Sequence, residues 1–336
     1  MRLSVILLGT FALCGAHLSW ASPTGSIIGF VKDPSGAFIV GARITLTNAA
    51  TSARLTALTG TSGAYLFPQL PPATYSLAAE AAGFKRAGIT NVLVEVDQIT
   101  RADLALEVGG VTETIEVSAA APLLQSDRST LSNVVDSRTI SSMPLNTRQF
   151  LDLALLTPGV VPAAVGALGG FAVAGARSES NVAQIDGVAN MDAPDNIVLT
   201  NFRITDAVQE FAVQTSVALP EFGRGTGGQV NIVTRSGGNR FHGSAFEYFR
   251  NTQMDAADFF INKSAGSKSP LNRNQFGSTL GGPIVRDRTF FFLSYEGFRQ
   301  VAPQVSSTRV PTAADRAMVS DPISRRLLQF WPEPNA

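Results

Sequence analysis

Apolar and polar residues alternate along the first hundred residues of this chain, as is typical of half-buried β-strands. Ile44 and Leu46 share one face of a predicted strand, and alternate residues of 102–106 share one face of another. Turn residues separate the strands: Asp33-Pro34-Ser35-Gly36 places Asp, Pro and Gly where a type I turn favours them. Short strands at this spacing predict a β-sandwich over residues 22–108.

Helix and strand signals are mixed over residues 123–238. Asn146 can cap a helix that Pro158-Gly159 would end. Asp186-Gly187 lies between apolar residues, which is the signal of a tight hairpin, and residues 210–215 have the pattern of a further strand. This region therefore predicts an α+β domain.

The last part of the chain, residues 239–336, is rich in short aromatic segments typical of strands. These segments are 241–249, 274–280 and 290–295. We expect turns at Gly281-Gly282-Pro283 and at 285–288. The alternation expected of a transmembrane strand is only partial, because three phenylalanines are consecutive at 290–292. The chain as a whole is predicted to be mainly β.

Composition narrows the class of protein. Hydrophobic residues make up 45% of the 336 residues and charged residues only 15%, where about a quarter is usual in soluble proteins. The 26 basic and 26 acidic residues balance, so no nucleic-acid partner is predicted. A chain so poor in charge is unusual for a soluble cytoplasmic protein.

Residues 1–21 have the features of a secretory signal peptide. Arg2 is followed by the apolar run 3–14 and by the small-x-small exit Ser19-Trp20-Ala21. The single cysteine, Cys14, falls within this leader, so the mature chain would have neither a disulfide nor a thiol nucleophile. No later segment has the ~20 unbroken apolar residues of a membrane helix, so entry into a membrane would have to use strands.

Several motifs of the predicted sandwich resemble the carboxypeptidase regulatory-like (transthyretin-like) domain. They are Gly29–Ala37, Gly41-Ala42, Thr59–Phe67, Leu70–Tyr75 and Ala82–Lys85. Ala73 departs from the pattern, since that family usually has glycine at this position, and the turn there would have less backbone freedom. The resemblance covers the whole predicted sandwich and implies the same fold.

The α+β region resembles the plug of Oar-like TonB-dependent transporters. The matching motifs, in the order of that family, are Leu145–Phe150, Leu156–Val160, Ile185–Val188 and Glu221–Gly223. The glycine-rich passage 219–243 is similar to the end of such a plug and the first barrel strand. Residues 274–277, 280–284 and 289–292 resemble the opening barrel strands of the same family.

This resemblance implies a transthyretin-like β-sandwich, an α+β plug and the first strands of an incomplete outer-membrane β-barrel, in that order. It implies a protein exported to the cell outer membrane, in contact with its lipid, with sandwich and plug on the periplasmic side. As the mobile or ligand-facing part of the plug we single out Asp186, Gly187, Glu221, Phe222 and Gly223.

The linker 109–122 contains the strand-like segment 111–119, which follows the glycine pair Gly109-Gly110. It is similar to a TonB box, whose backbone pairs with a strand of the periplasmic protein TonB. The residues that would make this pairing are Thr114, Ile115, Glu116 and Val117. The alternative, that the segment is the last strand of the sandwich or the first of the plug, is equally compatible with the sequence.

The length of the chain conflicts with a complete barrel. Barrels of this class have about 22 strands, and at about 10 residues per strand they need several hundred residues. Only about 100 residues follow Arg235, so we expect the chain to be the N-terminal part of a longer protein. We also expect the region after about Asn239 to be poorly packed on its own, because open barrel strands expose edges and apolar faces.

No catalytic, metal-binding or cofactor-binding residue is predicted. Gly223-x-Gly225-x-x-Gly228 matches the dinucleotide fingerprint, but that chemistry needs a helix after the third glycine, and a strand pattern follows here. Outside the leader, His242 is the only histidine, so neither a zinc set nor a Ser-His-Asp triad is available. Asp186, Asp192 and Asp195 lack the spacing of a calcium loop and are interpreted as turn residues. We therefore expect no enzymatic activity.

Two functions follow from these observations. The resemblance implies energised uptake of an unknown substrate, with carbohydrate and peptide as candidates, through a pore that the plug closes and TonB opens. The alternative is a secreted carbohydrate-binding sandwich, in which Tyr65, Tyr75 and Phe84 would stack on sugar rings. Both leave the substrate unidentified.

Overall fold

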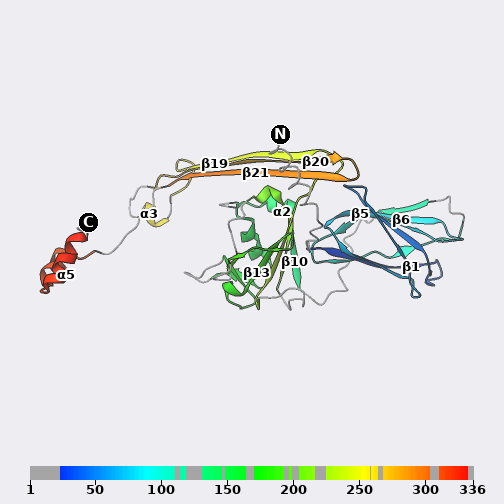
Figure 1. The fold of residues 1–336 in the computed structure, drawn as a ribbon, viewed down its shortest axis with the longest axis horizontal. Coiled ribbons are helices and arrows are strands. Elements are labelled where there is room, and N and C mark those ends of the chain that lie inside the picture. Colours follow the sequence, from blue (N-terminus) through cyan, green and yellow to red (C-terminus); the bar gives the residue numbers. More distant parts are fainter. Residues whose placement is uncertain are drawn as a thin grey trace, which may run out of the picture. The chain divides into compact units, whose positions relative to one another are not determined.

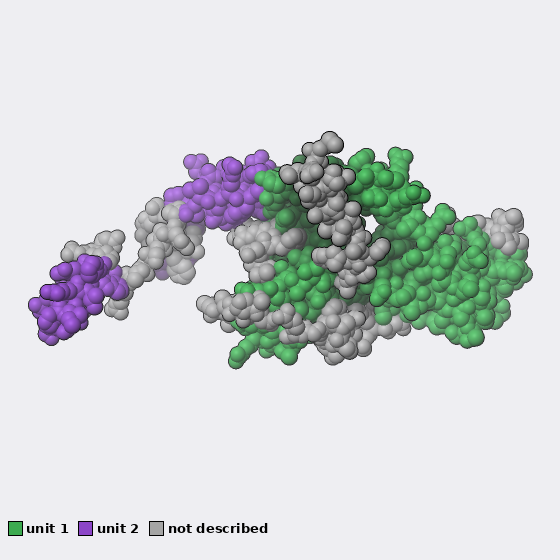
Figure 2. All heavy atoms as spheres, in the orientation of Figure 1, with its two compact units in different colours: residues 1–246, 277–296 green, residues 247–276, 297–336 purple. Residues whose placement is uncertain are grey.

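The computed structural model describes residues 23–109, 114–118, 131–145, 148–163, 170–192, 197–198, 204–215, 225–257, 259–263, 268–302 and 310–331. It has two compact units, residues 1–246 with 277–296 and residues 247–276 with 297–336 (Figure 2). Most of the elements are strands (Figure 1), which confirms the prediction of a mainly β chain.

The N-terminal part of the first unit is a β-sandwich. In one sheet the central strand β1 (Gly25–Lys32) pairs with β4 (Ala64–Leu70), β7 (Ile99–Arg101) and β8 (Leu104–Ala105). The other sheet has the order β3 (Arg54–Leu58), β2 (Arg43–Asn48), β5 (Ala73–Glu80), β6 (Arg86–Val94) and β9 (Thr114–Ser118). The predicted sandwich is therefore present.

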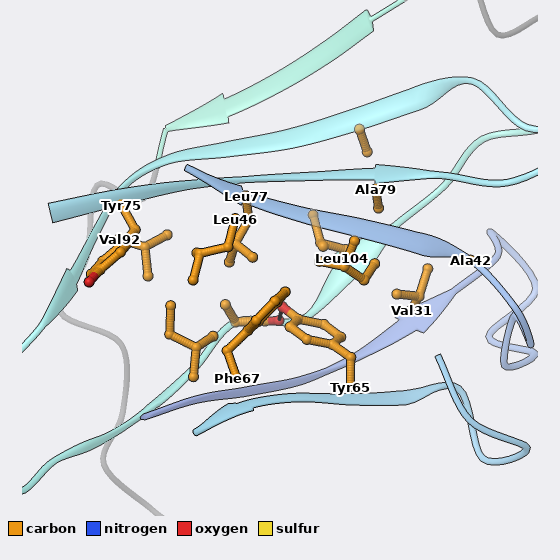
Figure 3. Packing of buried hydrophobic residues seen from close by; sticks show 14 of the residues in the cluster. Val31, Ala42, Leu46, Tyr65, Phe67, Tyr75, Leu77, Ala79, Val92 and Leu104 are labelled. Carbon is orange, nitrogen blue, oxygen red and sulfur yellow. Dashed lines mark hydrogen bonds between the residues drawn. The ribbon is translucent and has the colours of Figure 1, made fainter. Parts of the chain in front are cut away.

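The core of the sandwich lies between these two sheets (Figure 3). Ile44 and Leu46 are at most 1% exposed while Arg43 is exposed, as their alternation predicts. Tyr65 and Phe67 from β4 pack edge to face, with ring centroids 6.0 Å apart. Each fully buried side chain of this size stabilises the fold by about 1.5–3 kcal/mol, so the alternating residues are enough to hold the two sheets together.

The predicted turn at Asp33-Pro34-Ser35-Gly36 is present. The N–H of Gly36 donates to the carbonyl oxygen of Asp33 at 3.0 Å, and the Asp33 carboxylate accepts from the N–H groups of Ser35 and Ala37, both at 2.9 Å. An aspartate at the first position of a turn stabilises it in this way.

A second domain, here called the central domain, occupies the described residues from 132 to 234. Its five-stranded sheet has the order β10 (Ser132–Asp136), β17 (Val208–Gln214), β18 (Gln229–Thr234), β13 (Val182–Ile185) and β14 (Val188–Ala189). The pair β13 and β18 is parallel, and the other three pairs are antiparallel. Two small hairpins accompany it, β11 (Val160–Pro162) with β12 (Phe171–Val173) and β15 (Met191–Asp192) with β16 (Ile197–Val198).

Short helices cover one face of the central sheet. They are α2 (Ser137–Ser142), η1 (Phe150–Leu156), η2 (Ser178–Ser180) and η3 (Thr205–Ala207). Phe150 of η1 meets Phe211 of β17 with ring centroids 5.7 Å apart, and both are fully buried. The helix expected after Asn146 is thus a 3₁₀ helix that begins at Phe150 and ends before Pro158-Gly159; Asn146 itself lies outside the described residues.

Three long strands follow the central domain in the order β19 (His242–Asn251), β20 (Asn272–Val285) and β21 (Thr289–Val301). The turn expected at 285–288 is present, with Asp287 at φ +61°. The turn expected at Gly281-Gly282-Pro283 is wrong, because these residues lie inside β20. Large apolar side chains on the strands remain exposed, among them Leu293 at 64% and Tyr295 at 63%.

The remaining helices are α3 (Phe259–Lys263), α4 (Ala313–Met318), α5 (Pro322–Leu327) and η4 (Leu328–Phe330), all in the second unit. Both α4 and α5 are capped by their side chains: Thr312 and Asp315 form a capping box, and Asp321 accepts from the N–H of Ser324. None of the helices that the structure describes is long and apolar enough to cross a bilayer.

Candidate functional site

The strand proposed to bind a partner, residues 111–119, is found as the edge strand β9. Thr114–Ser118 pair in parallel with Arg86–Thr90 of β6, while residues 111–113 and 119 lie outside the described residues. In the described part of the chain, no strand pairs with the other edge of β9. Its position is that of the last strand of the sandwich, yet an open edge offers the backbone groups that a further strand would need.

The Asp186-Gly187 hairpin is present as predicted. It joins β13 to β14, and Asp186 and Gly187 have φ values of +47° and +82°, as a type I′ turn requires. The Asp186 carboxylate accepts from the N–H of Thr234 at 2.9 Å and from its hydroxyl at 2.6 Å. The hairpin is therefore bound to the last residue of β18.

The structure describes two of the five residues singled out in the central domain, Asp186 and Gly187. Glu221, Phe222 and Gly223 lie outside the described residues, so their relation to the Asp186-Gly187 turn stays a prediction. In the described segments no three His, Cys, Asp or Glu side chains form a group that could hold a metal ion.

A site that sequence reasoning missed lies on the face of the central sheet opposite its core. Strand alternation puts Phe211 and Ile232 in the core and turns their neighbours to this second face. The second face consists of Glu210, Ala212 and Gln214 of β17 and Gln229, Asn231 and Val233 of β18. These six residues are only 0–6% exposed, so the face is covered rather than solvated.

The cover is the turn between β6 and β7, Glu95–Gln98, here called the docking turn. Val96 is fully buried and packs against Ala212 and Val233. Three hydrogen bonds join the docking turn to the central domain. The Val96 N–H donates to Glu210 Oε1, the Asn231 side-chain amide donates to Asp97 Oδ2, and the Gln98 side-chain amide donates to the Ser132 hydroxyl.

The charge at this contact is unusual because several carboxylates face one another. Burial, and then the negative charges of Glu95, Asp136 and Asp97, raise the pKa of Glu210 to about 7, against a partial lowering by the Val96 N–H. Burial and the charge of Asp136 also raise the pKa of Glu95. The pKa of Asp136 is lowered because its carboxylate caps α2 through Thr139.

Sequence reasoning could not find this contact. Glu210 alternates with core residues along β17, which is the ordinary pattern of a strand with one solvated face. The only signal of a covered second face in the sequence is that Gln229 and Asn231 carry uncharged amides where they alternate with apolar residues on β18. Nothing local to either strand indicates that a turn more than a hundred residues earlier covers this face.

A cavity of about 820 Å³ is lined by the sandwich turns 48–53 and 69–73 and by residues 235–240. Its described lining includes Arg235, Arg240 and His242 and no aspartate or glutamate. A cavity with these side chains favours a neutral or anionic ligand over a cationic one.

Two of the three aromatic residues proposed to stack on sugars are buried. Tyr65 and Tyr75 are each only 4% exposed, and their hydroxyls donate to the carbonyl oxygens of Ala102 and Pro71. Phe84 is partly buried against the same core. The stacking role proposed for Tyr65 and Tyr75 is therefore wrong, because a ring can stack on a sugar only with an exposed face, and for Phe84 it stays a prediction.

Two families match separate parts of the chain. Residues 26–107 match the carboxypeptidase regulatory-like domain, and residues 233–327 match an outer membrane beta barrel domain. The TonB-dependent transporter Oar of Myxococcus xanthus is 30% identical to this chain over 88% of its length. The chain is a homologue of the Oar-type TonB-dependent transporters.

This Oar homologue belongs to the outer membrane, as the matches to the barrel family and to the transporter indicate. It spans 29% of the length of its Myxococcus relative. The siderophore receptor PirA of Acinetobacter baumannii shares 20% identity over 51% of the chain and 24% of the receptor, with a TM-score of 0.36. Hydroxyquinol 1,2-dioxygenase of Pseudomonas putida shares 10% identity over 26% of the chain and 57% of the enzyme, with a TM-score of 0.21. Neither fit is close enough to add to the argument.

Proposed function

We propose that this chain supplies the sandwich, the plug and the first barrel strands of an energised outer-membrane transporter. The observation that carries the proposal is the relationship to Oar over 88% of the chain, which includes all three parts. In this proposal the central domain is the plug that closes the pore, and the sandwich and plug face the periplasm. The substrate stays unknown, with carbohydrate and peptide as candidates.

We propose that TonB binds at β9. Edge strands recruit a partner's strand through backbone N–H and C=O groups, so Thr114, Ile115, Glu116 and Val117 would add the TonB strand to the sheet through the open edge of β9. A pull on this strand would act on the chain between the sandwich and the plug. The Asp186-Gly187 turn and the residues Glu221, Phe222 and Gly223 are the proposed mobile part of that plug.

The test is binding of the TonB C-terminal domain to the chain in detergent, with proline variants of β9. Successive N–H groups of a strand point to opposite edges, so Ile115→Pro and Glu116→Pro together remove one donor from each edge. We expect at least one of them to abolish binding. Thr56→Pro in β3, the strand at the opposite edge of the same sheet, is the matched control and should bind normally. If both β9 variants bind TonB as the parent chain does, the assignment of the TonB site to β9 is wrong.

A further inference from the structure

The contact between the docking turn and the second face buries the carboxyl of Glu210 without an ion pair to any described lysine or arginine. Glu210 is 6% exposed and accepts the N–H of Val96. No described lysine or arginine forms an ion pair with Glu210. A buried carboxylate that lacks a cation favours its neutral form.

We propose that this contact is pH-dependent: the sandwich is docked on the central domain in mildly acidic surroundings, and ionisation of Glu210 releases it as the pH rises. The partner surfaces are the docking turn, Glu95–Gln98, and the second face of the central sheet. The contact joins residues 114 positions apart in the chain, so its release would separate two domains rather than loosen one.

The acidic groups that face Glu210 come from two elements. The docking turn contributes Glu95 and Asp97, and the end of β10 contributes Asp136. On the neighbouring elements, Arg138 acts on Asp136, and the Arg235 side chain donates to the carbonyl oxygen of Val208. Ionised Glu210 would therefore face three carboxylates and no paired cation, which is unfavourable while the contact stays closed.

The direction of the pH effect follows from the two states of Glu210. When the domains separate, the carboxyl meets water and its pKa returns toward the ordinary value of 4.5, whereas burial raises the pKa to about 7 in the docked state. The contribution of Glu210 to docking is complete below its undocked pKa of 4.5 and is lost as the pH rises through its docked pKa of about 7. Between these values the docking equilibrium should weaken by up to about tenfold per pH unit.

The neighbouring carboxyls do not reverse this direction. The pKa of Asp136 is lowered, so it stays ionised over the whole range. The pKa of Glu95 is raised by burial, so its ionisation also opposes docking as the pH rises. Glu95 therefore weakens docking in the same direction as Glu210, and Asp136 does not change that direction.

Spin-label distances test the proposal without a pH-dependent probe. The one native cysteine is Cys14, so Cys14→Ser with Leu58→Cys and Val188→Cys places labels only on the sandwich and on the central domain, at exposed positions. The full chain in detergent is measured by double electron–electron resonance from pH 5 to pH 9. We expect a narrow distance distribution at low pH and a second, broad population that grows between pH 5 and about 7 and levels off above it.

Two isosteric variants move this transition in opposite directions. Glu210→Gln still accepts the Val96 N–H but cannot ionise, so its narrow distribution should persist to pH 9. Asn231→Asp adds a carboxylate beside Asp97, so its opening should shift to lower pH. Asp152→Asn, at another plug carboxyl whose pKa is raised by burial, is the matched control and should follow the parent chain. A parent distribution that stays constant from pH 5 to pH 9, or a Glu210→Gln chain that opens like the parent, overturns the proposal.

Discussion

Asp186→Ala tests how strongly the hairpin of β13 and β14 depends on one side chain. The change removes both hydrogen bonds to Thr234 and leaves alanine at φ +47°, a conformation that aspartate tolerates better. Hydrogen bonds to a charged group contribute about 1.5–3 kcal/mol each when buried, and this pair is only partly buried. With about 1 kcal/mol of backbone strain added, we expect a loss of about 2–4 kcal/mol in the free energy of unfolding.

The measurement is thermal unfolding of the chain in detergent, where each 1 kcal/mol should lower Tm by about 2–4 °C. Asp186→Asn keeps an acceptor for the Thr234 N–H and the tolerance for positive φ, so it should cost less than about 1 kcal/mol. Asp186→Gly removes the hydrogen bonds to Thr234 but tolerates the positive φ, so its loss of stability should lie between those of Asp186→Asn and Asp186→Ala. Asp192→Ala, which removes a carboxyl that has no side-chain hydrogen bond among the described residues, should be neutral. The reasoning fails if Asp186→Ala matches the parent chain or if Asn is as damaging as Ala.

Two further substitutions address the cores of the two domains. Gly29→Ala should lower Tm, since the added methyl would overlap the carbonyl oxygen of Ala102; the matched change Gly88→Ala meets its nearest neighbour, an oxygen, at 3.4 Å and should be neutral. An unaltered Tm for Gly29→Ala would contradict this crowding. Phe211→Ala removes a fully buried ring and should cost about 3–5 kcal/mol by thermal unfolding, and a loss below about 1 kcal/mol would show that this ring is not central to the core of the central domain.

Local chemistry was enough to predict the elements whose determinants are neighbours in sequence. The faces of β2 follow from the alternation of Ile44 and Leu46, and the reversal at Asp186-Gly187 follows from two residues that tolerate positive φ. The edge position of β9 was only one of two alternatives, because a strand pattern does not reveal its neighbour.

Glycine has two uses, and sequence alone does not separate them. Gly281-Gly282-Pro283 was expected to be a turn but lies inside β20. A side chain at either glycine would collide with His242, the first residue of β19, or with Phe241 just before it. A Cβ on Gly281 would lie 2.7 Å from His242 Nε2, and one on Gly282 would overlap the ring of Phe241. These glycines allow a close approach between strands rather than a reversal of the chain.

The contact of Glu210 with Val96 could not be predicted for a different reason. Its two partners belong to different domains, and each looks ordinary in its own strand or turn. Only the three-dimensional arrangement shows that the second face is covered, and burial together with the neighbouring carboxylates gives Glu210 its raised pKa.

The strand order of the central sheet has a consequence for biogenesis. Its last strand in sequence, β18, is also its middle strand, lying between β17 and β13. Until Thr234 has left the ribosome, β17 and β13 have no common neighbour and the sheet cannot assemble. A nascent chain arrested before this point would lack the strand that joins the β10–β17 pair to the β13–β14 hairpin.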